Sequence, residues 1–166
     1  MKALTLIQPW ASLIADGRKT IETRSWAPPK RLIGQRIAIH AGIKVENELA
    51  AKWGYERLPV GAVIATAKLA GVRRVVDISA GGGMAVCVSA YEKSGPDLFG
   101  GSTRFLYEID EYGDFGIGRV LWILDEVKRG IPMPAIGKLG LWYWDGDPVN
   151  ALRRDIAPPI TAVVGT

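Results

Sequence analysis

The chain has 166 residues and a mass of 18.0 kDa, the size of one ordinary globular domain. Hydrophobic residues make up 48% and charged residues 23%, and no apolar run reaches the roughly 18–20 residues that cross a bilayer. The only cysteine, Cys87, excludes an internal disulfide, and the only histidine, His40, excludes a Cys/His zinc site. We therefore expect a cytoplasmic protein with no signal peptide, no membrane association, no metal and no other cofactor. The sequence does not indicate an oligomeric state.

The first half of the chain predicts short strands and two short helices. We expect, in order, a strand over residues 3–7, a helix from Gln8-Pro9 to Gly17, a strand over 19–24, a strand over 36–41 and a helix over 44–53. Pro9 suits the first helical turn, and Gly17 is a natural helix end.

The second half predicts longer apolar strands and a glycine-rich insert. We expect a central strand over 61–69 that continues over 72–76, and then an insert over residues 79–102 in which 84–91 form a short helix or strand. A strand over 120–127 follows, then an extended turn at Pro132 and Pro134 and a last strand over 141–144. The tail over 145–166 is expected to dock on the body. Because the strands do not alternate regularly with helices, the predicted fold class is α+β, with a small twisted β-barrel and short helices packed beside it.

The net charge of +4 is distributed unevenly along the chain. Residues 1–44 hold eight basic and two acidic side chains, a net charge of +6, whereas the remainder carries −2. This asymmetry favours an anionic partner near the N-terminal third, and the alternative is a basic face that only contacts water.

The stretch from Gly17 to Arg24 concentrates three charged side chains that suit a polar ligand. Lys19 supplies a point cation, Glu22 an acceptor for an amino group or a proton, and Arg24 a planar fork for phosphate or a carbonyl edge. Glu22 and Arg24 are two residues apart and therefore share one face of the predicted strand. We predict a pocket lined by these three side chains, and the alternative is an exposed ion pair.

Four further side chains are candidate pocket residues with a structural alternative each. Gln8 reads a base edge or caps the helix, Trp10 lines the pocket or belongs to the core, Trp26 stacks on a base or only packs, and His40 is a polar pocket residue or a hydrogen-bonded structural histidine.

These residues resemble the ASCH domain, a member of the PUA-like superfamily of β-barrel folds. The resemblance is carried by Leu6-Ile7-Gln8-Pro9-Trp10-Ala11 followed by a G-x-K-x-x-E-x-R stretch at residues 17–24, and it continues over 36–41, 61–65 and 132–144. It implies a PUA-like ASCH domain over residues 1–144 with the insert at about 79–102, followed by the tail at 145–166.

The resemblance implies binding of RNA or of a modified nucleotide or nucleoside. In that interpretation Lys30, Arg31 and Arg36 contact phosphates, while the pocket holds the base. Some similar proteins are nucleoside amidohydrolases that remove an acyl group from cytidine, and others have ribonuclease activity. Lys19 matches the amidohydrolases' catalytic lysine, but Glu22 stands where they have a threonine nucleophile. The alternatives are therefore an N4-acylcytidine amidohydrolase-like hydrolase or a metal-independent ribonuclease that uses Lys19 and Glu22 as catalytic residues, and a protein-interaction module.

Overall fold

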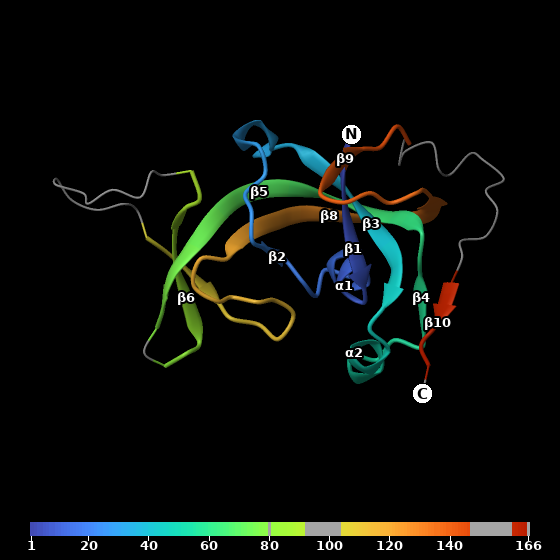
Figure 1. The fold of residues 1–166 in the computed structure, drawn as a ribbon, viewed down its shortest axis with the longest axis horizontal. Helices are drawn as coiled ribbons and strands as arrows, with labels where there is room; N and C mark the ends of the chain where they lie inside the picture. Colours follow the sequence, from blue (N-terminus) through green and yellow to red (C-terminus); the bar gives the residue numbers. More distant parts are fainter. Residues whose placement is uncertain (80, 92–103, 147–160, 166) are drawn as a thin grey trace. The chain divides into compact units, whose positions relative to one another are not determined.

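The structure is a computed structural model that describes residues 1–79, 81–91, 104–146 and 161–165 (Figure 1). Its elements in chain order are β1 (Lys2–Gln8), α1 (Trp10–Ala15), β2 (Ile21–Arg24), the 3₁₀ turn η1 (Lys30–Leu32), β3 (Arg36–Val45), α2 (Asn47–Lys52), β4 (Arg57–Pro59), β5 (Ala62–Ile78), β6 (Met84–Ser89), β7 (Phe105–Glu108), β8 (Val120–Pro134), β9 (Leu141–Tyr143) and β10 (Thr161–Val163). The described part is mostly β with two short α-helices, which confirms the predicted fold class.

The chain divides into two compact units, which are described separately. Unit 1 consists of Met1–Lys19, Arg36–Lys68 and Glu126–Thr166, and unit 2 consists of Thr20–Gln35 and Leu69–Asp125. The long strands β5 and β8 contribute residues to both units.

Unit 1 is built around β1, which lies between β3 and β9. β1 runs parallel to β3, with Thr5 opposite His40, and antiparallel to β9. The first part of β5 continues the sheet on the far side of β3, and helix α1 packs against β1 and β3 (Figure 1). A buried cluster lies on one face of this sheet and contains Ala3, Ala38, Val63, Trp142 and Trp144. The pairing of the strands therefore fixes the position of Trp142 and Trp144 relative to the polar side chains of β3, such as His40.

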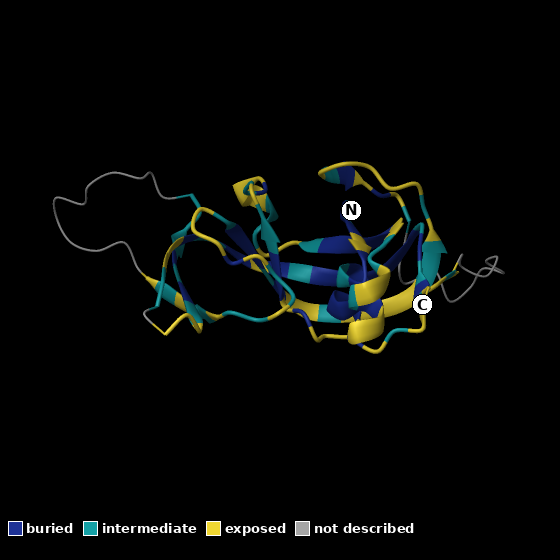
Figure 2. Cartoon of the chain, turned by 60° about the horizontal axis from the view of Figure 1, so that its bottom comes forward, coloured by how far each residue is buried: buried dark blue, intermediate teal, exposed yellow. Residues whose placement is uncertain are grey.

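Unit 2 combines a strand pair with a small antiparallel meander. β2 pairs with the first part of β8, while the second part of β5 pairs with β6, and β6 pairs with β7. The core of the unit is a second apolar cluster, made of Ile21, Val75, Ala85, Cys87, Phe115 and Leu121. Figure 2 colours each described residue of the chain as buried, intermediate or exposed.

The strand predicted over 61–69 and 72–76 is one continuous element, β5, so Gly71 does not interrupt it. Residues 84–89 form strand β6, one of the two predicted alternatives. The tail does dock, because β10 pairs with β4. The rest of the insert, residues 92–103, and tail residues 147–160 lie outside the described residues.

Several predicted boundaries were wrong. β2 begins at Ile21 rather than at residue 19, α2 spans only Asn47–Lys52, and β8 continues to Pro134 instead of ending at 127. Strands β4, β7 and β10 and the turn η1 were not predicted. These strands have only three or four residues each, too few for a periodic pattern.

Candidate functional site

Lys19 lies in the irregular segment that connects α1 to β2. Gly17 has a φ of +74°, a left-handed conformation that glycine adopts without a Cβ clash, and this ends the helix. The backbone N–H groups of Arg18 and Lys19 both donate to the carbonyl of Leu13, so the chain stays close to the helix end. The Lys19 residue is fully buried within unit 1.

Glu22 and Arg24 form an ion pair on β2, in unit 2. Arg24 Nε lies 3.0 Å from Glu22 Oε1, and the two side chains are 28% and 8% exposed. Glu22 is opposite the fully buried Trp122 of β8. The shared strand face predicted for Glu22 and Arg24 is therefore present, with a nearly buried carboxylate and a guanidinium that still reaches solvent. The pocket that would combine them with Lys19 stays a prediction.

Trp26 follows β2 and is only partly buried. Its ring meets the ring of Trp122 edge to face, with the ring centres 4.9 Å apart, and its carbonyl accepts a hydrogen bond from Trp122 Nε1 at 3.3 Å. Trp10 in unit 1 makes a similar edge contact with Trp53 at 5.8 Å. Both indoles therefore have packing partners and retain some exposed surface.

The side-chain amide of Gln8 is engaged inside unit 1. Its Nε2 donates to Ser12 Oγ at 2.9 Å and to the carbonyl of Pro59 at 2.7 Å, while Oε1 accepts the Ser12 N–H at 3.1 Å. Both amide hydrogens are used, and Gln8 is fully buried. These bonds favour the structural alternative, in which Gln8 caps the first turn of α1.

His40 is buried at 1% exposure in unit 1. Its Nε2 lies 3.0 Å from the carbonyl of Ala135, and its ring meets Trp142 edge to face at 5.5 Å. Burial lowers the pKa of His40, and the bond to Ala135 opposes this only in part. His40 is therefore a neutral imidazole that donates from Nε2, as the structural alternative describes.

The predicted phosphate contacts differ in their surroundings. Lys30 and Arg31 lie on η1 in unit 2, and both are exposed. Arg36 lies in unit 1 at the start of β3, where its guanidinium donates to Thr66 Oγ1 and to the carbonyl of Glu126 and pairs with the Glu126 carboxylate. Arg36 is thus partly committed to neighbouring side chains.

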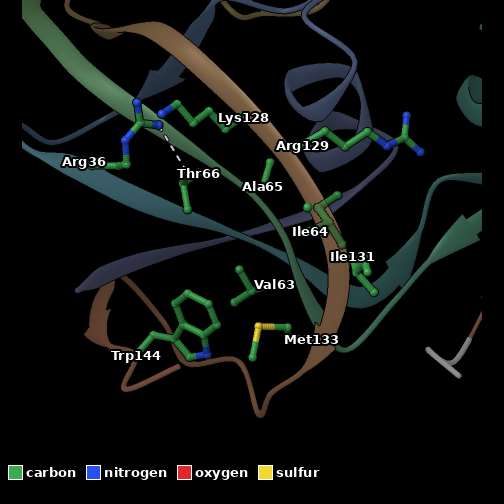
Figure 3. Close-up of a pocket in the computed structure, with 11 residues that line it drawn as sticks. Arg36, Val63, Ile64, Ala65, Thr66, Lys128, Arg129, Ile131, Met133 and Trp144 are labelled. Carbon is green, nitrogen blue, oxygen red and sulfur yellow. Dashed lines mark hydrogen bonds between the residues drawn. The ribbon is translucent and has the colours of Figure 1, made fainter. Parts of the chain in front are cut away.

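A pocket of about 280 Å³ lies within unit 1, next to Arg36 (Figure 3). It is lined by residues of β3, β5, β8 and the segment after β9: Arg36, Val63, Ile64, Ala65, Thr66, Lys128, Arg129, Gly130, Ile131, Met133 and Trp144. Of these residues, only Arg36 was predicted from the sequence as a site residue. The adjacent basic residues Lys128 and Arg129 could have indicated an anion-binding site, but the strand was predicted to end at residue 127, so they were not placed beside Arg36.

Within the described part of the chain, no group of three or more His, Cys, Asp or Glu side chains is placed to hold a metal ion. No helix there is long and apolar enough to cross a membrane.

Comparison with known proteins identifies a family match. The ASCH domain matches residues 4–103 of the chain. Among solved structures, the chain is similar to the crystal structure of ASCH from Zymomonas mobilis, with 19% identity, a TM-score of 0.44 and coverage of 99% of this chain and 87% of that chain. Two mutant forms of the Zymomonas mobilis protein match at 19% identity over 99% of this chain, with TM-scores of 0.43 and 0.44 and coverage of 89% and 87% of their own chains. No curated protein matches the sequence.

Proposed function

The chain belongs to the ASCH domain family, and we propose that it binds RNA, or a nucleotide with an exposed or modified base, through Glu22 and Arg24. The family match confirms the resemblance to the ASCH domain noted in the sequence. The ligand and the roles of these two residues are our proposal.

The observation that carries the proposal is the Glu22–Arg24 pair on β2. A side-chain carboxylate that is only 8% exposed loses much of its hydration, and this loss destabilises the folded protein unless hydrogen bonds compensate for it. Arg24 orients this carboxylate, and Glu22 can accept a hydrogen bond from the amino group of a base. The guanidinium of Arg24 is 28% exposed, and its planar shape suits a phosphate or a base carbonyl.

Other residues of unit 2 support the same ligand class. Trp26 follows Arg24 directly after one serine, and its partly exposed ring offers a surface on which a base stacks. Lys30 and Arg31 are exposed and follow within the same segment, where they attract phosphates without reading the sequence.

The test compares Glu22→Gln with Glu48→Gln, which removes the same charge from an exposed position in α2. Removal of any negative charge favours RNA binding slightly through weaker repulsion. If Glu22 accepts a hydrogen bond from the base, Glu22→Gln should instead weaken the affinity for a short mixed-sequence single-stranded RNA by about tenfold, because a hydrogen bond to a charged group is lost. Fluorescence anisotropy of labelled RNA measures the RNA affinity of both variants.

An affinity that changes equally in the two variants would refute the role of Glu22. The unmodified protein and a Lys19→Ala variant should also be incubated with N4-acetylcytidine. If the unmodified protein deacylates this substrate, and Lys19→Ala binds it but does not deacylate it, the hydrolase alternative replaces the binding function.

A further inference from the structure

The pocket of unit 1 has two chemically different ends. Figure 3 shows the cationic side chains of Arg36 and Lys128 at one end and Val63, Met133 and Trp144 at the other. No acidic residue is among those that line it. A ligand that fits must therefore combine an anionic group with an apolar or aromatic body.

At the cationic end, Arg36 is held in place but is not saturated. One of its terminal nitrogens, Nη1, donates to Thr66 Oγ1 at 3.1 Å and to the Glu126 carbonyl at 2.9 Å, and Nη2 donates to Glu126 Oε2 at 3.3 Å. A guanidinium has five N–H donors. The three bonds to described residues leave the Nε–H and one Nη2–H, so the group is both oriented and able to bind an oxyanion.

The same end carries an excess of positive charge. Glu126 pairs with Lys68 at 2.9 Å and with Arg36, and the pKa of Glu126 is lowered chiefly by Lys68 and to a smaller extent by Arg36 and Lys128. Three cations thus act on the Glu126 carboxylate. Lys128 itself makes no hydrogen bond or ion pair with any described residue, whereas the neighbouring Arg129 is paired with Asp16. The uncompensated charge next to the pocket belongs to Lys128 and to the shared Arg36.

The backbone at Glu126 is unusual in a way that maintains this arrangement. Its φ is +46°, a left-handed conformation that is uncommon for a residue other than glycine. Both its carbonyl and its carboxylate bind Arg36, so the turn in the backbone places two acceptors on one guanidinium. Strained residues of this kind often occur beside ligand sites.

The apolar end continues the core cluster of unit 1. Val63 and Trp144 are buried members of that cluster, and Met133 packs against it while remaining partly exposed. A flat ring that enters the pocket meets an aromatic and a thioether, which are favourable contacts for a base. A volume of about 280 Å³ is small among ligand pockets, so it holds one nucleotide and not several.

We propose that this pocket binds a nucleoside monophosphate, with its phosphate at Arg36 and Lys128 and its base against Met133 and Trp144. The nucleotide class rests on the proposed function, whereas the anionic and apolar requirements rest on the pocket alone. Every residue that lines the pocket belongs to unit 1, whereas Glu22 and Arg24 belong to unit 2.

Isothermal titration of the full chain with cytidine monophosphate, cytidine and inorganic phosphate tests the proposal. The monophosphate should bind more tightly than either fragment. Lys128→Ala should weaken its binding about fivefold, as expected for a lost contact between two charges. Lys138→Ala, which removes the same charge from an exposed position outside the pocket, should leave it unchanged. Glu126→Gln should tighten binding, because a competing carboxylate is removed.

The outcomes separate this proposal from the function assigned to Glu22. Equal effects of Lys128→Ala and Lys138→Ala, or inorganic phosphate binding as tightly as the monophosphate, would overturn the pocket assignment. If Glu22→Gln weakens RNA binding at the same time, the proposed function still stands. If Lys128→Ala weakens monophosphate binding while Glu22→Gln leaves RNA binding intact, the pocket assignment holds and the role of Glu22 fails. Lys128 is exposed, so its variant tests the pocket even if Glu126→Gln does not fold.

Discussion

At the scale of single residues, His40 illustrates how burial controls a group that titrates near neutral pH. The ordinary pKa of histidine is 6.5, and burial lowers the pKa of His40 in the folded protein. Nδ1 finds no hydrogen-bond partner among the described residues. Gly137 packs closely against this part of the ring, because a Cβ added at Gly137 would lie only 2.8 Å from Nδ1. A protonated imidazole would place a second N–H donor in this enclosed position.

The stability of the protein should therefore decrease in mild acid. Because the unfolded chain binds the proton more tightly than the folded chain, the free energy of unfolding falls as the pH drops below about 6.5 and continues to fall until the lowered pKa of folded His40 is reached. Above about 6.5, His40 contributes no pH dependence. Urea unfolding from about pH 5 to pH 7.5 measures this.

His40→Gln provides the comparison, because the Gln amide preserves a donor near the position of Nε2 and does not titrate. Since His40 is the only histidine, this variant should lose most of the pH dependence between about 5 and 6.5. An unchanged slope would show that carboxylates, and not His40, control stability in that range.

At the scale of elements, the two-stranded pair of β4 and β10 depends on a few backbone bonds. Leu58 in β4 is buried, and it is opposite Ala162 of β10. Directly after β10, the Val164 N–H donates to the carbonyl of Glu56 at 3.0 Å. In an antiparallel pair, hydrogen-bonded positions alternate with positions that face away. Val164 is therefore bonded to the β4 side, and Val163 is not.

Substitution by proline should distinguish these two neighbours. Val164→Pro removes a backbone donor that is used, whereas Val163→Pro removes one that faces away from β4. We expect Val164→Pro to lower the free energy of unfolding by about 0.5–1.5 kcal/mol more than Val163→Pro. Equal losses in urea titrations would mean that the pairing of β10 with β4 contributes little to stability.

At the scale of the whole molecule, the +6 charge of residues 1–44 is the strongest indication of an anionic partner. The structure divides this charge into groups with different availability. Lys30 and Arg31 are exposed, Lys19 is buried, and Arg36 shares its charge with Glu126. Among these basic residues, Lys30 and Arg31 are therefore best suited to contact the phosphates of the proposed RNA ligand.

If the chain binds RNA as proposed, its RNA affinity should fall as the salt concentration rises, and the double variant Lys30→Ala/Arg31→Ala should reduce that dependence. For single-stranded nucleic acid, the slope of log affinity against log salt is about −0.7 per phosphate neutralised, so two lost contacts should reduce its magnitude by about 1.4. Arg104→Ala/Lys138→Ala removes the same charge elsewhere and should leave the slope unchanged. Equal slopes in the two double variants would assign the phosphate contacts to other residues.

Local patterns in the sequence predicted much of the fold and the family. The alternation over β2 predicted that Glu22 and Arg24 share a face, and their ion pair confirms it. Trp142 and Tyr143 are neighbours in β9, and they are 8% and 70% exposed, as the alternation along a strand requires. These features succeed because side-chain direction in a strand repeats every two residues and needs no knowledge of distant segments.

Contacts between distant segments were decided only by the tertiary structure. Arg36 meets Glu126 across 90 residues and His40 meets Ala135 across 95, so neither partner follows from a local pattern. The same holds for β10, which has three residues and becomes a strand only because β4 supplies its hydrogen bonds. By itself the sequence determined which residues carry charge and the family to which the chain belongs. The tertiary structure decided which of those charges are neutralised, because that depends on which groups folding brings within hydrogen-bonding distance.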